Sequence, residues 1–471
     1  MNYKRYAHNG DFSLTRVKPR LTLSGGMIAA ARLLLSLALL AAAVAPIFGE
    51  TPEVIVISPH WEGIKDETSR AFSAWHEKTF GQPAVIRWRQ LGSGGGSEII
   101  KFLRGEYADH GSSGVDVLYG GGVDPFHELK KDGLLARCDL PADILAAMPA
   151  QLNGMAIRDP DMEWFGSSLS GFGIVTNERA RGVLGLPPAL CWSDLADPRL
   201  AGWISASDPR ASSSALSIYE IILQSLGWER GWAVLLQMSA NTRTFLSSSA
   251  ASVVEVGVGD AVYGVAIDSY GQAQASYYGP ENVSFVMPQG ETVINPDSIA
   301  ILKNPPHPEM ARRFLQFVLG QPGQLLWMLP KGAPGGATRA TINRMSVYPA
   351  LYNELAGVTP VRTNPFTLPT NLHYSEELGS KRRSVLSLII AACMIDSHDD
   401  LARAWKALNA SPPPPRRDAL MAELLAPPCT EAQLLADAAI HDPVQRTALV
   451  NGWQNDALRR YRDIVRQAAQ P

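Results

Sequence analysis

The chain has little cysteine and no cysteine-based motif. Its four cysteines, Cys138, Cys191, Cys393 and Cys429, include no CxxC pair and no paired histidine spacing, so the sequence offers no zinc site. In an oxidising compartment Cys393 and Cys429, both in the carboxyl-terminal region, would be able to form a disulfide. Four separate buried thiols explain the same residues equally well.

Enzyme motifs are absent as well. The sequence has no Gly-x-Ser-x-Gly nucleophile turn, no His-Glu-x-x-His zinc motif and no Walker A loop. Asp116 and Asp124 are carboxylates of the kind that hydrolases use, but their spacing does not indicate a catalytic pair. We therefore expect no enzyme activity, and a secreted α/β hydrolase is retained as an alternative.

Clustered positive charge is missing from most of the chain. The net charge is −3, and removing the +5 of residues 1–49 leaves −8 for the remainder. An acidic chain without a basic cluster is a poor match to nucleic acid. We expect no nucleic-acid partner.

A hydrophobic run lies near the amino terminus. Residues 29–45 are rich in Leu and Ala, follow a basic stretch and end in small residues, which predicts a secretory signal peptide within residues 1–49. Translation that started at Met27 would remove the long polar segment, residues 1–26, that precedes the hydrophobic run. An uncleaved membrane anchor is the alternative, because about 17 to 20 apolar residues can just span a bilayer. Either way, the remainder is expected in the periplasm.

Short β-branched runs then alternate with amphipathic segments, a pattern typical of parallel sheets covered by helices on both faces. The first series has predicted strands at 54–57, 84–88 and 115–119 and helices at 66–80, 97–103 and 124–132. A second series covers 171–287, followed by a strand at 297–302 and a helix at 308–319. Beyond about residue 340 the pattern becomes helical, with Pro-rich joints.

Polar and glycine-rich turns follow the predicted strands, where an open α/β sheet binds small molecules. The candidate ligand-binding residues are His60, Ser93, Gly94, Gly95, Ser97, Gly120, Gly121, Gly122, Ser168, Ser170, Ser212, Ser213, Asp268 and Tyr270. For the glycine and serine turns, the alternative is a plain turn, solvated loop or helix cap. For Tyr270 it is a core position, and for a lone histidine such as His60 a structural role.

Each candidate has its own chemistry. Ser97, which follows the glycine loop 92–96, and Ser212 and Ser213 open predicted helices, where free backbone N–H groups meet an anion. The glycines at 120–122 allow a ligand to approach the backbone. Asp268 offers a carboxylate for an amine, and Tyr270 a phenol for a metal or a stacked ligand.

Several segments, in order, resemble the periplasmic substrate-binding proteins of bacterial ABC importers, in particular the ferric-iron-type branch. They are residues 114–117 (GVDV), 192–202 (WSDLADPRLAG), 208–214 (DPRASSS) and 308–319 (PEMARRFLQFVL). The likeness covers about residues 53–330.

The resemblance implies an α/β, two-lobed periplasmic-binding-protein-like fold of type II, with a ligand held between hinged lobes. The first lobe would comprise 50–160 and 295–340, the second 161–294, and residues 341–471 a helical carboxyl-terminal extension. The implied partners are a small-molecule or metal ligand and the permease subunits of an ABC importer, with the receptor itself a monomer. A sensor that uses the helical tail to bind a partner protein is a further alternative.

Ferric iron is the ligand that the resemblance suggests first. His60 matches the position of a histidine ligand in ferric-binding relatives, and Tyr270 falls where they carry paired tyrosines. The sequence departs from that pattern, because Ser269 replaces one tyrosine and Gly120 to Gly122 stand where an acidic ligand is expected. Fe³⁺ prefers phenolate, carboxylate and imidazole, so an anionic solute competes with iron as the expected ligand.

Overall fold

The computed structural model describes residues 51–91, 96–368, 372–410, 413–414 and 416–470. The predicted signal segment and Ser93, Gly94 and Gly95 lie outside these residues. Among the helices that are described, none combines the length and the apolar character needed to cross a membrane. Residues 52–471 form one compact unit.

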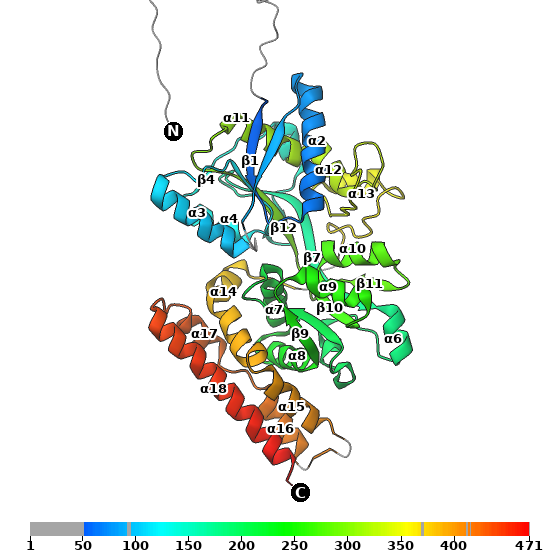
Figure 1. The fold of residues 1–471 in the computed structure, drawn as a ribbon, viewed down its shortest axis with the longest axis vertical. Helices are drawn as coiled ribbons and strands as arrows, with labels where there is room; N and C mark the ends of the chain where they lie inside the picture. The colour runs from blue at the N-terminus through cyan, green and yellow to red at the C-terminus, as the bar shows by residue number, and fades with distance from the viewer. Residues whose placement is uncertain (1–50, 92–95, 369–371, 411–412, 415, 471) are drawn as a thin grey trace, which may run out of the picture. The chain divides into compact units, whose positions relative to one another are not determined.

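The first lobe is built on parallel strands with helices on both faces of the sheet. β1 (Glu53–Ile57) pairs in parallel with β2 (Val85–Arg89) and β3 (Val117–Tyr119). Alternate residues of a strand point to opposite faces, so Val54 and Val56 join one core cluster whereas Ile57 joins another. Helices α2 (Glu62–Phe80), α11 (Pro308–Leu319) and α12 (Gln321–Met328) cover the first face, and α3 (Gly96–His110) and α4 (Asp124–Lys131) cover the other (Figure 1).

Two long strands connect the lobes. β12 (Ile294–Leu302) runs antiparallel to β3 in the first lobe and to β7 (Phe165–Asn177). The later half of β7 pairs with β10 (Tyr263–Ile267) and β11 (Val283–Val286) of the second lobe. The sheet is therefore mixed, because antiparallel crossing strands join the parallel series that the sequence predicted. The two-lobed α/β fold itself is confirmed.

In the second lobe, β10 pairs in parallel with β8 (Ile204–Ser207), which pairs in parallel with β9 (Thr242–Leu246). Its helices are α6 (Glu178–Leu184), α7 (Ser213–Leu226), α8 (Trp228–Asn241), α9 (Ser249–Val258) and α10 (Asp268–Tyr278), with 3-10 turns η1 (Trp192–Ala196) and η2 (Pro198–Leu200). Short elements of the first lobe are β4 (Leu135–Ala136), α5 (Ala142–Ala147), β5 (Gln151–Leu152) and β6 (Met155–Ala156). Strand β9 had no counterpart in the sequence prediction.

The segment after residue 340 divides between the lobes, whereas the sequence suggested a single extension. Residues 342–352, which reach into α13 (Pro349–Glu354), pack into the core of the first lobe. Strand β12 also pairs with β3 of that lobe. From Leu372 onward the chain packs against α7 and α8 of the second lobe (Figure 1). The elements of this later part are α14 (Glu376–Ile390), η3 (Ala391–Ile395), α15 (His398–Leu408), α16 (Arg417–Leu425), α17 (Glu431–Asp437) and α18 (Pro443–Ala468).

The four cysteines are free thiols. Burial raises the pKa of Cys393 to about 12 and that of Cys138 to about 11. Thiols with such pKa values remain protonated at neutral pH and are poor nucleophiles. The structure therefore agrees with four separate thiols and shows no disulfide between Cys393 and Cys429.

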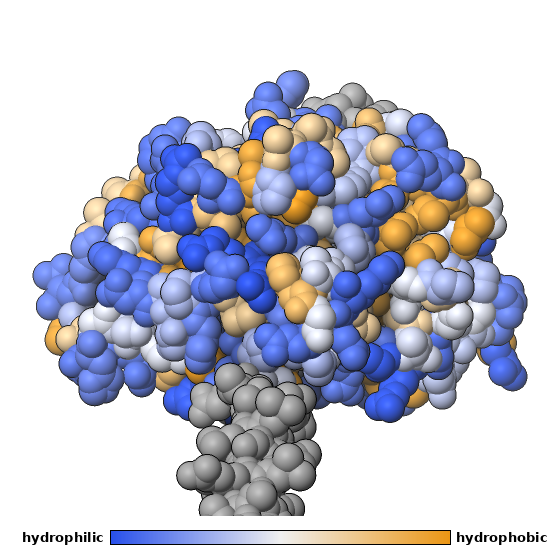
Figure 2. Space-filling model, turned by 90° about the horizontal axis from the view of Figure 1, so that it is seen from above, coloured by the Kyte–Doolittle hydropathy of each residue, from blue (hydrophilic) through white to orange (hydrophobic). Residues whose placement is uncertain are grey.

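The surface seen in Figure 2 is mostly hydrophilic, with small groups of apolar residues between the polar ones. Elsewhere, single exposed apolar side chains include Val183 and Val444. Scattered apolar residues of this kind are normal on a folded protein.

A buried ion pair fastens the tail to the second lobe. Arg382 on α14 is 1% exposed and binds both carboxylate oxygens of Glu220 on α7, each at 2.8 Å. It also pairs with Glu431 of α17. Two such bonds satisfy the carboxylate of Glu220, which is itself buried.

Replacing Arg382→Leu should lower the free energy of unfolding by about 3–5 kcal/mol, because Glu220 would be left buried and unpaired. Denaturant unfolding followed by tryptophan fluorescence measures this. The exposed Arg403→Leu is the control, and the double variant E220L/R382L should recover much of the loss. Equal stability of R382L and R403L would contradict the assignment.

Candidate functional site

A cavity of about 120 Å³ lies between the two lobes. Its first-lobe wall comes from the loop after β1, the turn after β3 and the start of β12, and its second-lobe wall from the starts of α7 and α10. The lining residues are Pro59, His60, Trp61, Ile64, Gly121, Gly122, Asp124, Ser170, Phe172, Ser213, Ser214, Ser217, Ile267, Ser269, Tyr270, Asn295, Pro296, Asp297 and Arg344.

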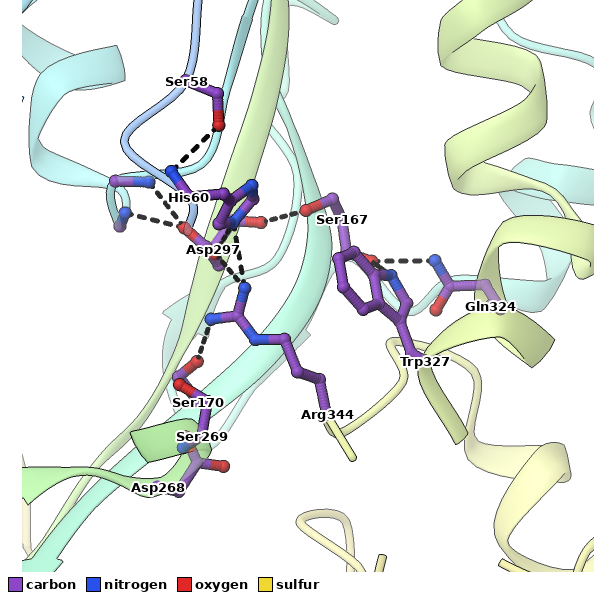
Figure 3. Close-up of polar contacts among 12 residues, drawn as sticks. Ser58, His60, Ser167, Ser170, Asp268, Ser269, Asp297, Gln324, Trp327 and Arg344 are labelled. Carbon is purple, nitrogen blue, oxygen red and sulfur yellow. Dashed lines mark hydrogen bonds and ion pairs between the residues drawn. The ribbon is translucent and has the colours of Figure 1, made fainter. Parts of the chain in front are cut away.

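A buried charge network forms one side of this cavity (Figure 3). Asp297 Oδ2 lies 2.5 Å from Arg344 Nη1 and 2.8 Å from His60 Nε2. Asp297 Oδ1 accepts hydrogen bonds from the backbone N–H groups of Gly121 at 2.8 Å and Gly122 at 2.9 Å. Arg344 Nη2 donates to Ser170 Oγ at 3.0 Å. All four carboxylate contacts favour the ionised form of Asp297.

The network sets the protonation of its members. Burial alone would raise the pKa of Asp297, but Arg344 and His60 outweigh burial and hold that pKa well below its usual value. Burial lowers the pKa of His60, although Asp297 opposes the shift. The site thus combines one carboxylate, one guanidinium and a neutral imidazole at neutral pH.

Local backbone geometry brings these groups together. A register shift in β12 between Asp297 and Ser298 marks a bulge, which re-aims a side chain at the end of regular pairing. Gly120 has φ +88°, and a Cβ there would lie 2.5 Å from the ring of His60. Glu67 on α2 accepts the backbone N–H groups of Thr338 and Ala340, which fixes the segment leading to Arg344.

The opposite wall presents helix amino termini and hydroxyl groups. Ser213 and Ser214 are the first residues of α7, where backbone N–H groups have no partner within the helix. Ser214 Oγ and the N-cap Ser212 Oγ lie 3.0 and 2.9 Å from Ser249 Oγ, at the start of α9. The positive end of the α7 dipole therefore faces the cavity, and the start of α9 lies behind it, against Ser212 and Ser214.

The structure brings six of the predicted residues to the cavity wall: His60, Gly121, Gly122, Ser170, Ser213 and Tyr270. Trp61 also lines it. Ser97 lies in the first turn of α3.

Four predicted residues lie behind the wall. Gly120 packs against the His60 ring, and Ser168 is fully buried within β7. Ser212 caps α7 by accepting the N–H of Ala215. Asp268 borders a separate small cavity together with Asn343. These positions follow from local geometry, because capping and strand pairing turn the side chains away from the opening.

The prediction from sequence missed Arg344 and Asp297. Asp297 was recognised only as the start of a predicted strand, and the bulge that aims its side chain leaves no sequence signal. Arg344 lies outside both series of strands and helices. Ser214, Ser217 and Asn295 line the cavity too, and of these only Ser214 stood in a motif that the sequence analysis singled out.

The cavity has few of the features of a ferric site. Among residues 51–470 as far as they are described, no group of three or more His, Cys, Asp or Glu side chains could hold a metal ion. Burial raises the pKa of Tyr270, which keeps the phenol protonated, and Arg344 places a fixed positive charge in the wall. A hard trivalent cation prefers ionised oxygen ligands, and the two carboxylates of the lining, Asp124 and Asp297, are already paired with arginines.

Comparison with known proteins identifies the central part of the chain. Residues 112–344 match the family of bacterial extracellular solute-binding proteins. This match covers just under half of the chain. The resemblance to periplasmic substrate-binding proteins, predicted from the sequence, is thereby confirmed.

The names of similar proteins mention different small molecules or ions. A phosphoglycerate transport regulatory protein of Salmonella typhimurium is 31% identical over 181 residues, which are 38% of this chain and 45% of the relative. The match thus spans less than half the length of that relative. The periplasmic binding protein AfuA from Actinobacillus pleuropneumoniae, solved with fructose-6-phosphate, has a TM-score of 0.56 at 17% identity over 76% of this chain and 98% of its own.

A third similar structure is the apo ferric ion-binding protein A of Pasteurella haemolytica. Its TM-score is 0.55 at 18% identity, covering 72% of this chain and 97% of its own. At such identities the likeness to either solved structure shows a shared fold alone.

Replacing Gly120→Ala should push the His60 ring away from Asp297 and lower the melting temperature. Gly111→Ala is the matched control, because Gly111 also has positive φ, +69°, but faces open space. The control should lose only about 1–2 kcal/mol of folding stability, which is the cost of placing an alanine in the left-handed backbone region. Equal losses in thermal unfolding of both variants would contradict the close packing at His60.

Asp268 should make stability depend on pH. Burial raises the pKa of Asp268 to about 7, although Arg344 opposes the shift. Asp268 therefore keeps its proton in the folded state between about pH 4 and 7, where it is ionised in the unfolded state. The free energy of unfolding should fall as pH rises through this window, by about 1.4 kcal/mol per pH unit.

The variant Asp268→Asn removes this titration. Urea unfolding between pH 4.5 and 7.5 should show a flatter pH dependence for D268N than for the wild type. The exposed Asp418→Asn should leave the wild-type slope unchanged. The assignment fails if all three proteins show parallel curves.

Proposed function

We propose that the protein is the extracytoplasmic solute-binding receptor of an ABC-type importer. Residues 112–344 match the family of bacterial extracellular solute-binding proteins, and the cavity lies between two lobes joined by β7 and β12. Strands that cross between lobes suit a hinge, and a ligand that contacts both walls favours the closed state. The permease subunits would receive the solute, and the predicted export signal would deliver the receptor to the periplasm.

We infer that the solute is a small organic anion. The observation that supports this most directly is the meeting of Arg344, from the first lobe, with the amino-terminal end of α7, from the second, across one cavity. A guanidinium and free helix N–H groups both favour a phosphate or carboxylate. Hydroxyl groups of Ser213, Ser217 and Ser269 would complete its hydrogen bonds.

Asp297 limits which donors the solute can use. Its carboxylate already accepts hydrogen bonds from the N–H groups of Gly121 and Gly122 and from Nη1 of Arg344. The remaining Arg344 surface and the start of α7 would therefore hold the anionic group. Tyr270 and Asn295 suit the hydroxyl groups on the rest of the solute.

A phosphorylated solute fits this donor set better than ferric iron does. The names of the Salmonella and Actinobacillus relatives refer to phosphoglycerate and fructose-6-phosphate. A bare ferric ion would face Arg344 and a protonated Tyr270. Iron bound together with an anion is the competing ligand that the test includes.

Thermal unfolding should separate these ligands. We expect 3-phosphoglycerate or fructose 6-phosphate to raise the melting temperature, with about 2.7 kcal/mol of stabilisation at 100 times the dissociation constant. Ferric citrate should leave it unchanged. Ser213→Asp should abolish the shift by placing a negative charge at the anion site, whereas Ser248→Asp, at the N-cap of α9, should retain it. Stabilisation by ferric citrate alone would contradict the proposal.

A further inference from the structure

Helix α14 of the carboxyl-terminal tail is packed into the second lobe. Val385, Leu386 and Ile389 are fully buried in the core that α7 and α8 share. Arg382 on the same helix holds the buried Glu220 of α7. Because both the apolar face and the ion pair belong to the second lobe, the helix has no freedom to follow the first lobe.

The neighbouring residue on α14 points to the first lobe instead. Arg383 Nη1 lies 2.5 Å from Oδ2 of Asp124, in the first turn of α4. Their side chains are 24% and 36% exposed, so the pair is partly shielded from water. Consecutive arginines on α14 thus bind carboxylates of different lobes.

The second pair lies at the boundary of the solute cavity. Asp124 and Ser213 line this cavity and also a larger outer groove of about 690 Å³. Arg383 lines the groove but not the cavity. The ion pair therefore stands between the two spaces, with its carboxylate on the solute side and its guanidinium outside.

We propose that Arg383 latches the cleft: its ion pair with Asp124 links the second lobe, through α14, to the first lobe at the opening of the solute cavity. The pair can form only when the lobes are close together, so it favours the closed state. It also neutralises the carboxylate of Asp124, which would otherwise repel an anionic solute at the entrance. The identity of the solute that the latch would retain rests on the proposed function. The link between the lobes does not depend on that function, because it follows from the ion pair.

Small-angle X-ray scattering of the solute-free protein tests the latch directly. Arg383→Gln should increase the radius of gyration at low salt, and raising the salt concentration should open the wild type toward the same value. Lys381→Gln removes the same charge from the same helix, where Lys381 pairs with Glu377 of α14 itself. That control and the charge-conserving Arg383→Lys should scatter as the wild type does.

Two results would overturn the latch. One is a folded R383Q protein with the wild-type radius of gyration at every salt concentration, and the other is an equal increase in K381Q. If R383Q does not fold, the exchanged pair D124R/R383D decides, since it should restore a compact profile. An expanded profile of a folded exchanged variant would then reject the latch.

Stopped-flow tryptophan fluorescence extends the test to solute release. If 3-phosphoglycerate binds, R383Q should release it about five-fold faster than the wild type, as expected for one partly exposed pair. K381Q should release it at the wild-type rate. Unchanged release from R383Q would contradict the role in retention. Absence of any 3-phosphoglycerate binding would bear on the proposed function, and the scattering result would still decide the latch.

Discussion

The ion pair between Asp297 and Arg344 is the interaction on which the solute-binding face of the first lobe depends. Both side chains are almost fully buried, and an unpaired charge in such a place would be strongly unfavourable. The pair joins β12 to a segment that follows the last helix of the α/β series. Through the same carboxylate it also fixes the turn after β3 and the loop after β1. Three chain segments therefore keep their positions because one carboxylate needs all of their donors.

This arrangement explains how a receptor of this kind separates its structural charge from its ligand chemistry. Asp297 accepts the N–H groups of Gly121 and Gly122 and pairs with Arg344. The charges of Asp297 and Arg344 therefore balance each other on the first-lobe wall of the cavity. The start of α7 supplies donors from the second lobe. A solute that bridges the two walls gains contacts only when the lobes approach, which couples binding to closure.

The tail adds a second connection between the lobes. In a two-lobed receptor the crossing strands form the hinge, and nothing else need join the halves. Here α14 is built into the second lobe through Arg382 and reaches the first through Arg383. The extension is thus part of the solute-binding architecture as we interpret it, and residues 342–352 complete the core of the first lobe.

Much of the fold could be predicted because strand and helix periodicity is local. The helix at 308–319 and the strand after residue 53 are examples, because burial of one or both faces produces a regular spacing of apolar residues along the segment. Strand β9 was missed because Thr242 to Leu246 follow directly on α8 without a break. His60, Gly121 and Tyr270 could be proposed because each ends a strand or follows one.

The sequence by itself determined the alternation of elements, the two-lobed class and the sheet edge at which the cavity opens. Only the tertiary structure decided which charges meet there. Arg344 reaches His60 across 284 positions of the chain, and Asp297 faces it because of a bulge. Contacts between distant segments depend on how whole elements pack, and no local pattern of residues records that packing.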